Sequence, residues 1–569
     1  MRGGKRSSRI VLLTVFGILI LLTQIGCPTE IQQAEQQVPE RLLKVIAPAY
    51  TPHGPIVISS NNDFETQNWP GNGTVSDPYL IEGLNITYEG ISIDIQATSV
   101  HYLIQDCFLR NPLGVSLNLE YSHNGTINRC DIAGGAIGLY VFRSNDTIIA
   151  NSTIDSSINT FMATQSHRVL LLNSTLLCSE KGYSVSFGAC SSSSVTDCTF
   201  TGAILRISEC INLIIRRNNF SNGGLSFWPY EIENIYWNHS ISGNNVNGKP
   251  LGYFKDQSAM ILDGDSYGEV VLYNCTRMKV EGGRIEDAVK AIQIVLSPNC
   301  TVSDLEISGW GAGITIFESN YTIIDNCYKF GALNSGNFIT ITKSSYCRMT
   351  SNLDGGSGTS IWIDSGSNHF LNGNRMFPNL WGIALLSEES DSCIITSNFV
   401  MGCQIGINVD GSRHTILNNT IIESRSGISG TITNAAITDN MIRQGLYDGI
   451  SISSNNSIIT GNWITENDRI GIRLHEGSNG NKIFNNSIGR NAESNAHDDG
   501  FSNLWDDNVS IGNLWGDFPG MTPPYQIPGA AGSEDRYPLS DTIPPVLDGL
   551  THLNTSLHHN FPIQWYAFD

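Results

Sequence analysis

The stretch Ala436-Ile437-Thr438-Asp439-Asn440-Met441-Ile442 is matched 22 residues later by Ile458-Ile459-Thr460-Gly461-Asn462-Trp463-Ile464. In both copies an aliphatic side chain follows the asparagine by two residues. The pattern extends in both directions at intervals of 21 to 24 residues. Its asparagines are Asn352, Asn374, Asn398, Asn419, Asn440, Asn462 and Asn486. A period of this length, kept over some 130 residues, predicts a repeat architecture.

A second marker, an apolar-x-apolar triplet, keeps the same period. Its central residues are Thr315, Thr340, Trp362, Ala384, Asn408, Ser429, Ser451 and Arg473. Alternation with a period of two indicates strands, and three short strands with three turns fill about 22 residues. We therefore predict an all-β fold, a right-handed parallel β-helix of roughly 20 coils stacked about 4.8 Å apart. A leucine-rich repeat is disfavoured, because its L-x-x-L-x-L signature does not recur.

The recurring asparagine has a physical explanation within such a coil. Asparagine tolerates the left-handed backbone region that a tight turn between strands requires. Its amide can also bond to the asparagine of the next coil and so form a ladder. We expect both properties at these positions.

Composition excludes several classes of protein. The 569 residues carry a formal net charge of −21, which argues against a nucleic-acid partner because phosphate contacts need a basic face. An apolar share of 40% argues against wholesale disorder and against a polytopic membrane protein.

The N-terminal segment predicts export. Arg2, Lys5, Arg6 and Arg9 precede an apolar run, so residues 1–27 are typical of a signal peptide or signal anchor, the one predicted membrane contact. Cys27 follows Gly26 as in a lipobox and is a candidate for lipidation. Residues 28–54, rich in Gln, Glu and Pro, form a predicted spacer.

In an exported chain, N-x-S/T triplets are candidates for glycosylation. The candidates are Asn72, Asn85, Asn124, Asn145, Asn151, Asn173, Asn219, Asn238, Asn320, Asn418, Asn455 and Asn485.

Cysteines recur at the turn-to-strand position of the coils, as in Cys107, Cys130, Cys198, Cys275, Cys300, Cys327 and Cys347. Buried, stacked thiols explain this placement best, and disulfides remain the alternative in an exported chain. Zinc is disfavoured because the chain lacks C-x-x-C spacing.

The ends of the repeat carry a family resemblance. Residues 71–83, Val246–Phe254, Gly512-Asn-Leu-Trp-Gly-Asp517 and Asp535-Arg-Tyr-Pro-Leu539 resemble the signatures of NosD-type β-helix proteins, a group with carbohydrate-binding and sugar-hydrolysing domains. The resemblance implies a β-helix over residues 55–540, with an N-terminal cap at 55–86 and a C-terminal cap at 497–540. Residues 541–569 resemble a linker and the incomplete start of an immunoglobulin-like sandwich, which needs about 100 residues.

The resemblance leaves the chemistry open, because the group also includes copper-enzyme maturation proteins. A polysaccharide hydrolase or lyase needs carboxylates at a defined separation. Asp364 and Asp410, two residues beyond the triplet centres, are the candidates, with His475 in the same column. Trp362 and Arg473 are candidates for ligand binding.

Copper handling is a second alternative. Cu(I) prefers clustered Met or Cys and Cu(II) prefers His, whereas the chain has 9 Met without an M-x-x-M pattern. No cofactor is required by the sequence, and copper or calcium are the metals that remain to be considered.

The leading prediction is a non-catalytic module on the extracellular face of the cell membrane or cell surface. Its outward columns of Ser, Thr, Asn and Trp favour extracellular glycans or envelope components as partners.

Overall fold

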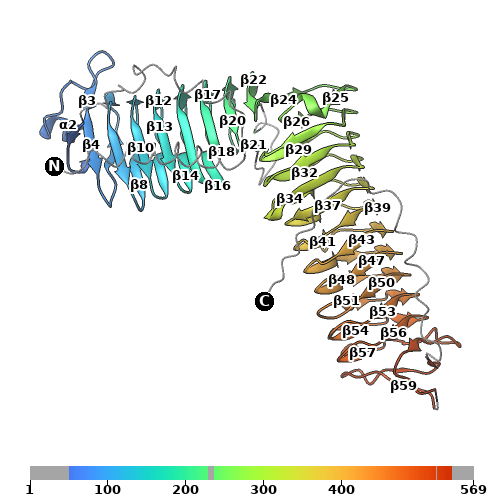
Figure 1. Ribbon diagram of the computed structural model, residues 1–569. Helices are drawn as coiled ribbons and strands as arrows, with labels where there is room; N and C mark the ends of the chain where they lie inside the picture. Colours follow the sequence, from blue (N-terminus) through green and yellow to red (C-terminus); the bar gives the residue numbers. More distant parts are fainter. Residues whose placement is uncertain (1–49, 228–235, 237, 521, 541–569) are drawn as a thin grey trace, which may run out of the picture. The chain divides into compact units, whose positions relative to one another are not determined.

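Short runs of alternating aliphatic and polar residues form the strands of this protein. The computed structural model describes residues 50–227, 236, 238–520 and 522–540, and it is almost entirely β-structure (Figure 1). The chain divides into two units, residues 1–51 and 52–569, and the β-helix lies in the second. The predicted signal segment with Cys27, most of the predicted spacer and the immunoglobulin-like segment lie outside the described residues.

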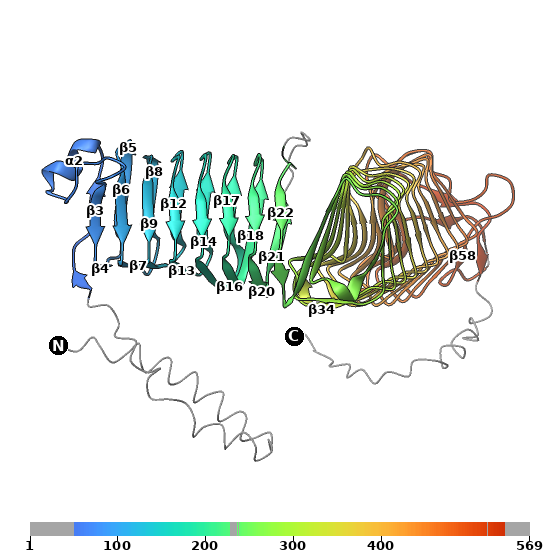
Figure 2. The same ribbon diagram turned by 90° about the horizontal axis from the view of Figure 1, so that it is seen from above.

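The second unit is a parallel β-helix, so the predicted fold class is confirmed. Each coil after residue 260 contributes one strand to each of three parallel sheets. In Figure 2 these coils are seen stacked one behind another. We name the three sheets sheet 1, sheet 2 and sheet 3. Sheet 1 comprises β24 (Lys249–Lys255), β26 (Glu269–Tyr273), β29 (Lys290–Val295), β32 (Ala312–Phe317), β35 (Ile339–Thr342), β38 (Thr359–Ile363), β41 (Trp381–Leu385), β44 (Ile405–Val409), β48 (Ser426–Thr433) with the short β45 (Gly411–Ser412) beside it, β51 (Ile450–Asn455), β54 (Ile470–Leu474) and β57 (Ser494–Asp498).

Sheets 2 and 3 complete each coil. Sheet 2 comprises β25 (Ile261–Asp263), β27 (Lys279–Glu281), β30 (Thr301–Ser303), β33 (Ile323–Asp325), β36 (Arg348–Thr350), β39 (Phe370–Asn372), β42 (Ile394–Thr396), β46 (Thr415–Leu417), β49 (Ala436–Thr438), β52 (Ile458–Thr460) and β55 (Lys482–Phe484). Sheet 3 comprises β28 (Arg284–Glu286), β31 (Glu306–Ser308), β34 (Tyr328–Ser335), β37 (Leu353–Ser357), β40 (Arg375–Met376), β43 (Phe399–Met401), β47 (Thr420–Ile422), β50 (Met441–Arg443), β53 (Trp463–Thr465), β56 (Ser487–Gly489), β58 (Leu514–Trp515) and β61 (Leu539–Ser540).

The coils before residue 250 use the same stacking. One side is an eight-stranded sheet of β3 (Tyr79–Glu82), β6 (Tyr102–Gln105), β9 (Gly125–Asn128), β12 (Ile148–Ala150), β15 (Leu170–Leu172), β17 (Ser194–Thr196), β19 (Ile214–Arg216) and β22 (Ser240–Ser242). The other sides contain β1 (Thr51–Pro52), β2 (Ile56–Ile58), β4 (Leu84–Thr87), β5 (Ile93–Thr98), β7 (Phe108–Asn111), β8 (Val115–Ser122), β10 (Asp131–Gly134), β11 (Ile137–Phe142), β13 (Thr153–Ser156), β14 (Asn159–Thr164), β16 (Thr175–Gly188), β18 (Thr199–Ser208), β20 (Asn219–Ser221), β21 (Gly224–Phe227) and β23 (Asn245–Val246).

Both ends of the β-helix are covered by side chains of irregular segments. The short helix α2 (Asn61–Thr66) places the buried Phe64 ring on Tyr79, with ring centroids 4.8 Å apart. At the other end, Trp505 and Trp515 are fully buried beside the short hairpin of β59 (Tyr525–Gln526) and β60 (Glu534–Asp535). An uncovered end would expose unpaired strands, so these aromatic residues protect the stack.

The predicted asparagine ladder is confirmed, but its backbone conformation differs from the prediction. From Asn352 onward the Nδ2 atom of each ladder asparagine donates to the Oδ1 atom of the next, at 2.9 Å in every case as far as Asn513. From Asn352 to Asn486 the left-handed residue is the one before each ladder asparagine, for example Asp439 before Asn440, at φ 55°. The expectation that the ladder asparagine itself is left-handed is therefore wrong, because the amide must point along the core instead of into the turn.

The predicted burial of the seven cysteines is confirmed, and so is the predicted position for all except Cys275, which lies two residues after β26. Cys107, Cys130, Cys198, Cys300, Cys327 and Cys347 come directly before a strand, and all of them are buried. Burial raises the pKa of the Cys327 thiol to about 12. Among the described residues no helix is long and apolar enough to cross a membrane.

Candidate functional site

The outer face of sheet 1 carries the predicted column of outward residues in the predicted register. Thr315 pairs with Thr340, Thr340 with Trp362 and Trp362 with Ala384 on successive strands. The column continues through Asn408, Ser429, Ser451 and Arg473 to His497. Flanking aliphatic residues of the same strands point into the core and are buried, so the chain's alternation decides which side chains face outward.

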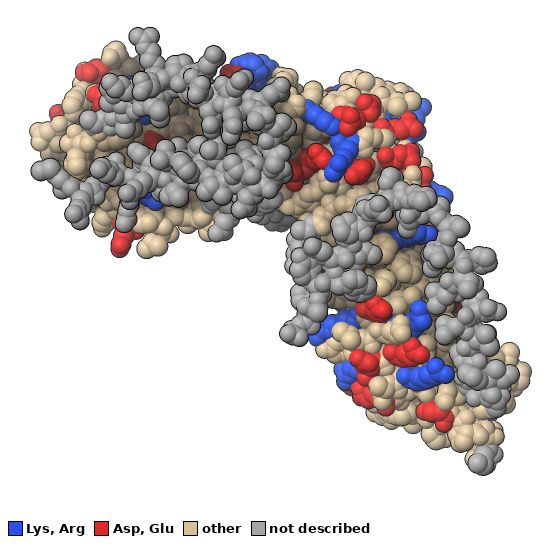
Figure 3. All heavy atoms as spheres, in the orientation of Figure 1, with Lys and Arg blue, Asp and Glu red and all other residues tan. Residues whose placement is uncertain are grey.

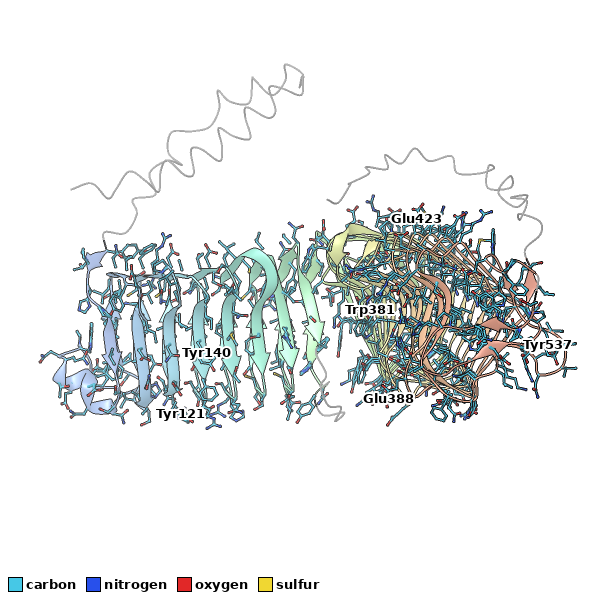
Figure 4. The ribbon with its side chains drawn as sticks, turned by 90° about the horizontal axis from the view of Figure 1, so that it is seen from below. Tyr121, Tyr140, Trp381, Glu388, Glu423 and Tyr537 are labelled. Atoms are coloured by element: carbon cyan, nitrogen blue, oxygen red, sulfur yellow. The ribbon has the colours of Figure 1, made fainter. Side chains whose placement is uncertain are left out.

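Two tryptophans of this face stack on each other. The rings of Trp362 (β38) and Trp381 (β41) lie 5.4 Å apart at their centroids, with an interplanar angle of 5°. Both are half-buried, and Trp381 lies at the outer side of the coils (Figure 4). The sequence prediction found Trp362 but missed Trp381, because Trp381 begins its strand and so lies outside the triplet pattern. Thr340, the register partner of Trp362 on the preceding strand, accepts a hydrogen bond from the Asn337 amide at 3.3 Å.

The candidate carboxylates are not brought together. Asp364 and Asp410 directly follow β38 and β44, and Leu386 occupies the intervening coil. Two coil spacings put them roughly 9.6 Å apart by strand geometry. The Oδ1 atom of Asp410 accepts the backbone amide of Thr431 at 2.8 Å, so this carboxylate also serves the turn of the next coil.

The last coils of sheet 1 hold a polar cluster around the other two candidates. Arg473 Nε donates to Asp448 Oδ2 at 2.8 Å, and this ion pair is largely buried. His475 Nε2 lies 3.0 Å from Ser451 Oγ. His497 pairs with Asp499 at 3.0 Å, and a hydrogen bond from the backbone amide of Ala530 lowers the pKa of Asp499.

Sequence reasoning missed Asp448, Ser451 and His497 as partners in this cluster. Ser451 was in the predicted column, and His497 follows Arg473 in the same column by one further period. Asp448 precedes its strand in a turn, where no periodic signal marks the direction of a side chain. The cluster already satisfies its own charges, so it offers few unpaired groups to a ligand.

A second aromatic group lies on the coils before residue 250. Tyr140 and Phe142 of β11 stack with centroids 6.0 Å apart, and Tyr121 meets Phe142 edge to face at 5.8 Å. The Arg143 guanidinium lies over the Phe142 ring at 5.1 Å and donates to the Tyr121 hydroxyl at 2.7 Å. Tyr121 and Tyr140 appear on the surface of these coils in Figure 4.

The predicted glycosylation candidates all lie at the surface. Asn85, Asn124 and Asn145 are half-buried, and the other nine are exposed. Their modification remains a prediction.

Copper ligands do not gather in the described part of the chain. No group of three or more His, Cys, Asp or Glu side chains in residues 50–227, 236, 238–520 and 522–540 is arranged to hold a metal ion. The described cysteines are free thiols, and Cys107 with Cys130 and Cys190 with Cys210 form contacting pairs. The buried His369 uses Nδ1 to accept the Cys347 amide at 3.3 Å.

Comparison with protein-family models finds a match. Residues 262–391 and 332–520 match the family model described as periplasmic copper-binding protein (NosD), so the predicted resemblance to NosD-type β-helix proteins is confirmed. The chain has no match among the curated proteins compared.

Two solved structures illustrate the structural likeness. A mannuronic acid specific polysaccharide family 6 lyase from human gut microbiota is 11% identical, with 86% of this chain and 91% of that chain covered and a TM-score of 0.27. A hyperthermoactive exopolygalacturonase from Thermotoga maritima is 13% identical, with 62% and 80% covered and a TM-score of 0.24.

Proposed function

Starting from the NosD match over residues 262–520, we propose that this protein is an exported, surface-located β-helix that binds extended neutral glycans without cleaving them. The observation that carries the proposal is the stacked pair of Trp362 and Trp381 on the outer face of sheet 1. Export is supported by the basic and apolar N-terminal sequence and by the periplasmic description of the matched family.

The tryptophan pair suits the apolar face of a sugar ring. Indole rings provide a large, rigid apolar surface with a polar edge, and the parallel stack of Trp362 and Trp381 holds that surface in one orientation. A pyranose that lay on it would place its hydroxyl groups beside the polar side chains of the column, such as Thr340 and Asn408. Short, uncharged side chains of this kind exchange hydrogen bonds with hydroxyl groups at little desolvation cost.

The charge of the protein favours neutral glycans over acidic ones. The formal net charge is −21, and a field of that sign slows the approach of polyanions. On the face shown in Figure 3, acidic and basic side chains are intermixed on a largely uncharged surface. The described surface in that view therefore offers no broad basic patch to a uronic-acid polymer.

Catalysis is not part of the proposal, because the candidate acid and base are separated. Leu386 lies between the coils of Asp364 and Asp410, and the Asp410 carboxylate accepts a backbone hydrogen bond. Arg473 and His475 each have a partner within the protein.

Affinity electrophoresis of the full chain in gels that contain neutral or acidic polysaccharides tests the proposal. We expect retardation by at least one neutral polysaccharide, and a roughly tenfold weaker affinity when Trp362→Ala and Trp381→Ala are combined, since stacked aromatic contacts contribute about 0.5–1.5 kcal/mol each. Trp463→Ala, on the half-buried outer side of sheet 3, is the matched control and should bind like the unchanged protein.

A reducing-sugar assay on the same polysaccharides completes the test. Binding that persists in the double tryptophan variant would refute the site. Release of sugar that Asp364→Asn or Asp410→Asn abolishes would replace the binding proposal with an enzyme.

A further inference from the structure

One inward column of sheet 3 is interrupted by two charged residues. The column runs through Ile285, Ile307, Lys329, Asp354, Met376, Val400 and Ile421, in direct register from coil to coil. Lys329 and Asp354 are paired partners on β34 and β37, and their exposed fractions are 0% and 1%. The core of the β-helix therefore encloses an amine and a carboxyl group on adjacent coils.

The two groups share one hydroxyl. Lys329 Nζ donates to Ser357 Oγ at 3.0 Å, and Ser357 Oγ donates to Asp354 Oδ1 at 2.7 Å. The amine also contacts Ser335 Oγ at 2.9 Å and the Gly336 carbonyl at 2.5 Å. Lys329 and Asp354 form no direct ion pair, so each is held beside the other without neutralising its charge by contact.

Burial disfavours the charged form of both groups. It lowers the pKa of Lys329 to about 8 and raises the pKa of Asp354. In some molecules both groups are therefore neutral. A neutral amine and a neutral carboxylic acid are the two species that condense to an amide. Replacing two buried ionisable groups by one neutral amide also removes their desolvation cost.

Asn379 supplies a donor on the other side of the carboxyl group. Its Nδ2 atom donates to Asp354 Oδ2 at 3.0 Å and to Ser360 Oγ at 2.5 Å. Its own Oδ1 atom is buried and has no hydrogen-bond partner. The hydrogen bonds of the Asn379 side chain are therefore those that its Nδ2 atom donates, one of them to this carboxyl group. A donor fixed at Oδ2 stabilises the negative charge that develops there during attack on Cγ.

We propose that Lys329 and Asp354 join in an intramolecular isopeptide bond that links two neighbouring coils inside the core. The Nζ lone pair attacks Cγ of the protonated Asp354, and charge develops on Oδ2 against the Asn379 amide. The Nζ–Cγ bond forms and the Cγ–Oδ1 bond breaks. Oδ1 leaves as water with the carboxyl proton and one proton from Nζ, which passes through the Ser357 hydroxyl. No oxidant, metal or activated donor is needed, because the amine and the carboxylic acid are held in the core on the same Ser357 hydroxyl and condense directly.

Mass spectrometry of the purified, denatured full chain tests the bond. We expect an intact mass lower by one water than the sequence of the mature chain requires. After trypsin digestion we expect one branched peptide that joins the segments around Lys329 and Asp354, with no cleavage after Lys329. Lys329→Met should restore the missing water, and Met is compatible with this column because Met376 already occupies it.

The controls separate the bond from other losses of water. Asp354 precedes Gly355, a sequence in which a cyclic imide forms with the same mass change, but an imide would persist in Lys329→Met and would give no branched peptide. Lys343→Met and Asp364→Asn alter an exposed lysine and an exposed aspartate and should leave the branched peptide in place. Ser357→Ala should lower the linked fraction.

If a variant fails to fold, the peptide map of the unchanged protein alone still tests the bond. Linear peptides that contain unmodified Lys329 and unmodified Asp354 in nearly all molecules would overturn the proposal. A branched peptide that joins Lys329 to Asn379, with the loss of ammonia, would also overturn it.

Discussion

The backbone amide of Asn513 donates to Asp535 Oδ2 at 2.7 Å, and this carboxylate ends the asparagine ladder. The same oxygen accepts the Trp515 indole at 2.8 Å. The last coil therefore presents its donors to a buried anionic group in place of another asparagine, which explains why the C-terminal cap carries the Asp535-Arg536-Tyr537 sequence at this point.

Removing the end of the ladder should destabilise the whole C-terminal region. In Asp535→Ala, the buried donors of Asn513 and Trp515 lose their acceptor, at a cost of roughly 1–3 kcal/mol for each unsatisfied group. Urea unfolding followed by tryptophan fluorescence measures the loss. Glu534→Ala, the exposed neighbour, should unfold at the same urea concentration as the unchanged protein, and an equal loss in both variants would contradict this role for Asp535.

Breaking the ladder in the middle should cost at least as much. Asn419 Oδ1 accepts both the backbone amide and the side-chain amide of Asn398, at 3.0 and 2.9 Å. Asn419→Ala orphans both Asn398 donors and removes the side-chain donor of Asn440 Oδ1, which keeps only the backbone amide of residue 419. We therefore expect a loss of several kcal/mol, on the order of 1–3 for each group. Asn408→Ala, a half-buried outward position, is the comparison and should change stability little.

Buried histidines predict acid sensitivity. Burial lowers the pKa of His369 to about 4, from an ordinary value of 6.5. Between these values the unfolded chain binds a proton that the folded chain does not, so the free energy of unfolding falls as pH decreases, by up to roughly 1.4 kcal/mol per pH unit. Urea unfolding at a series of pH values from 7.5 to about 4 measures this slope.

A single substitution isolates the contribution of His369. In His369→Asn we expect a shallower slope, because an asparagine can accept the Cys347 amide as Asn352 accepts that of Cys327. His475→Asn, at an exposed position, should retain the original slope. An unchanged slope in His369→Asn would mean that other groups govern acid sensitivity.

The buried thiols should be unreactive until the chain unfolds. Eleven of the twelve described cysteines are buried, and Cys178 is half-buried. Thiolates are the reactive form, and burial raises the pKa of Cys327 to about 12 and that of Cys198 to about 11. Peptide mapping after brief alkylation at neutral pH should show modification at Cys178 before Cys327. Rapid labelling of Cys327 in the folded protein would contradict the buried placement.

Periodicity made the fold and the outward column of sheet 1 predictable from sequence. Backbone pairing of coils forces residues one period apart into register, so counting from Ile to Ile placed Trp362 above Thr340 correctly. The same counting places Asp354 two residues after Asn352, where the other ladder asparagines are followed by an apolar residue. It missed Lys329, because the series of asparagines begins only at Asn352.

Contacts made outside the periodic positions could not be predicted. Trp381 reaches Trp362 from the start of its strand, and Asp448 reaches Arg473 from a turn, where side-chain direction depends on backbone angles that no repeat fixes. The left-handed residue was assigned one position too late for a related reason. Asparagine suits both a turn and a ladder, and only the three-dimensional arrangement shows that Asp439, Gly461 and their equivalents take the turn.

The asparagine ladder also gives the molecule a direction. In the bonds between ladder asparagines, every amide from Asn352 to Asn486 donates to the asparagine of the following coil. Each coil therefore offers an acceptor on its N-terminal side and a donor on its C-terminal side. A duplicated coil inserted in frame would find an acceptor for its asparagine amide and a donor for its asparagine oxygen on the neighbouring coils. The number of coils can therefore change by whole coils through duplication or deletion of the coding sequence. The carboxylate of Asp535 then still ends the ladder.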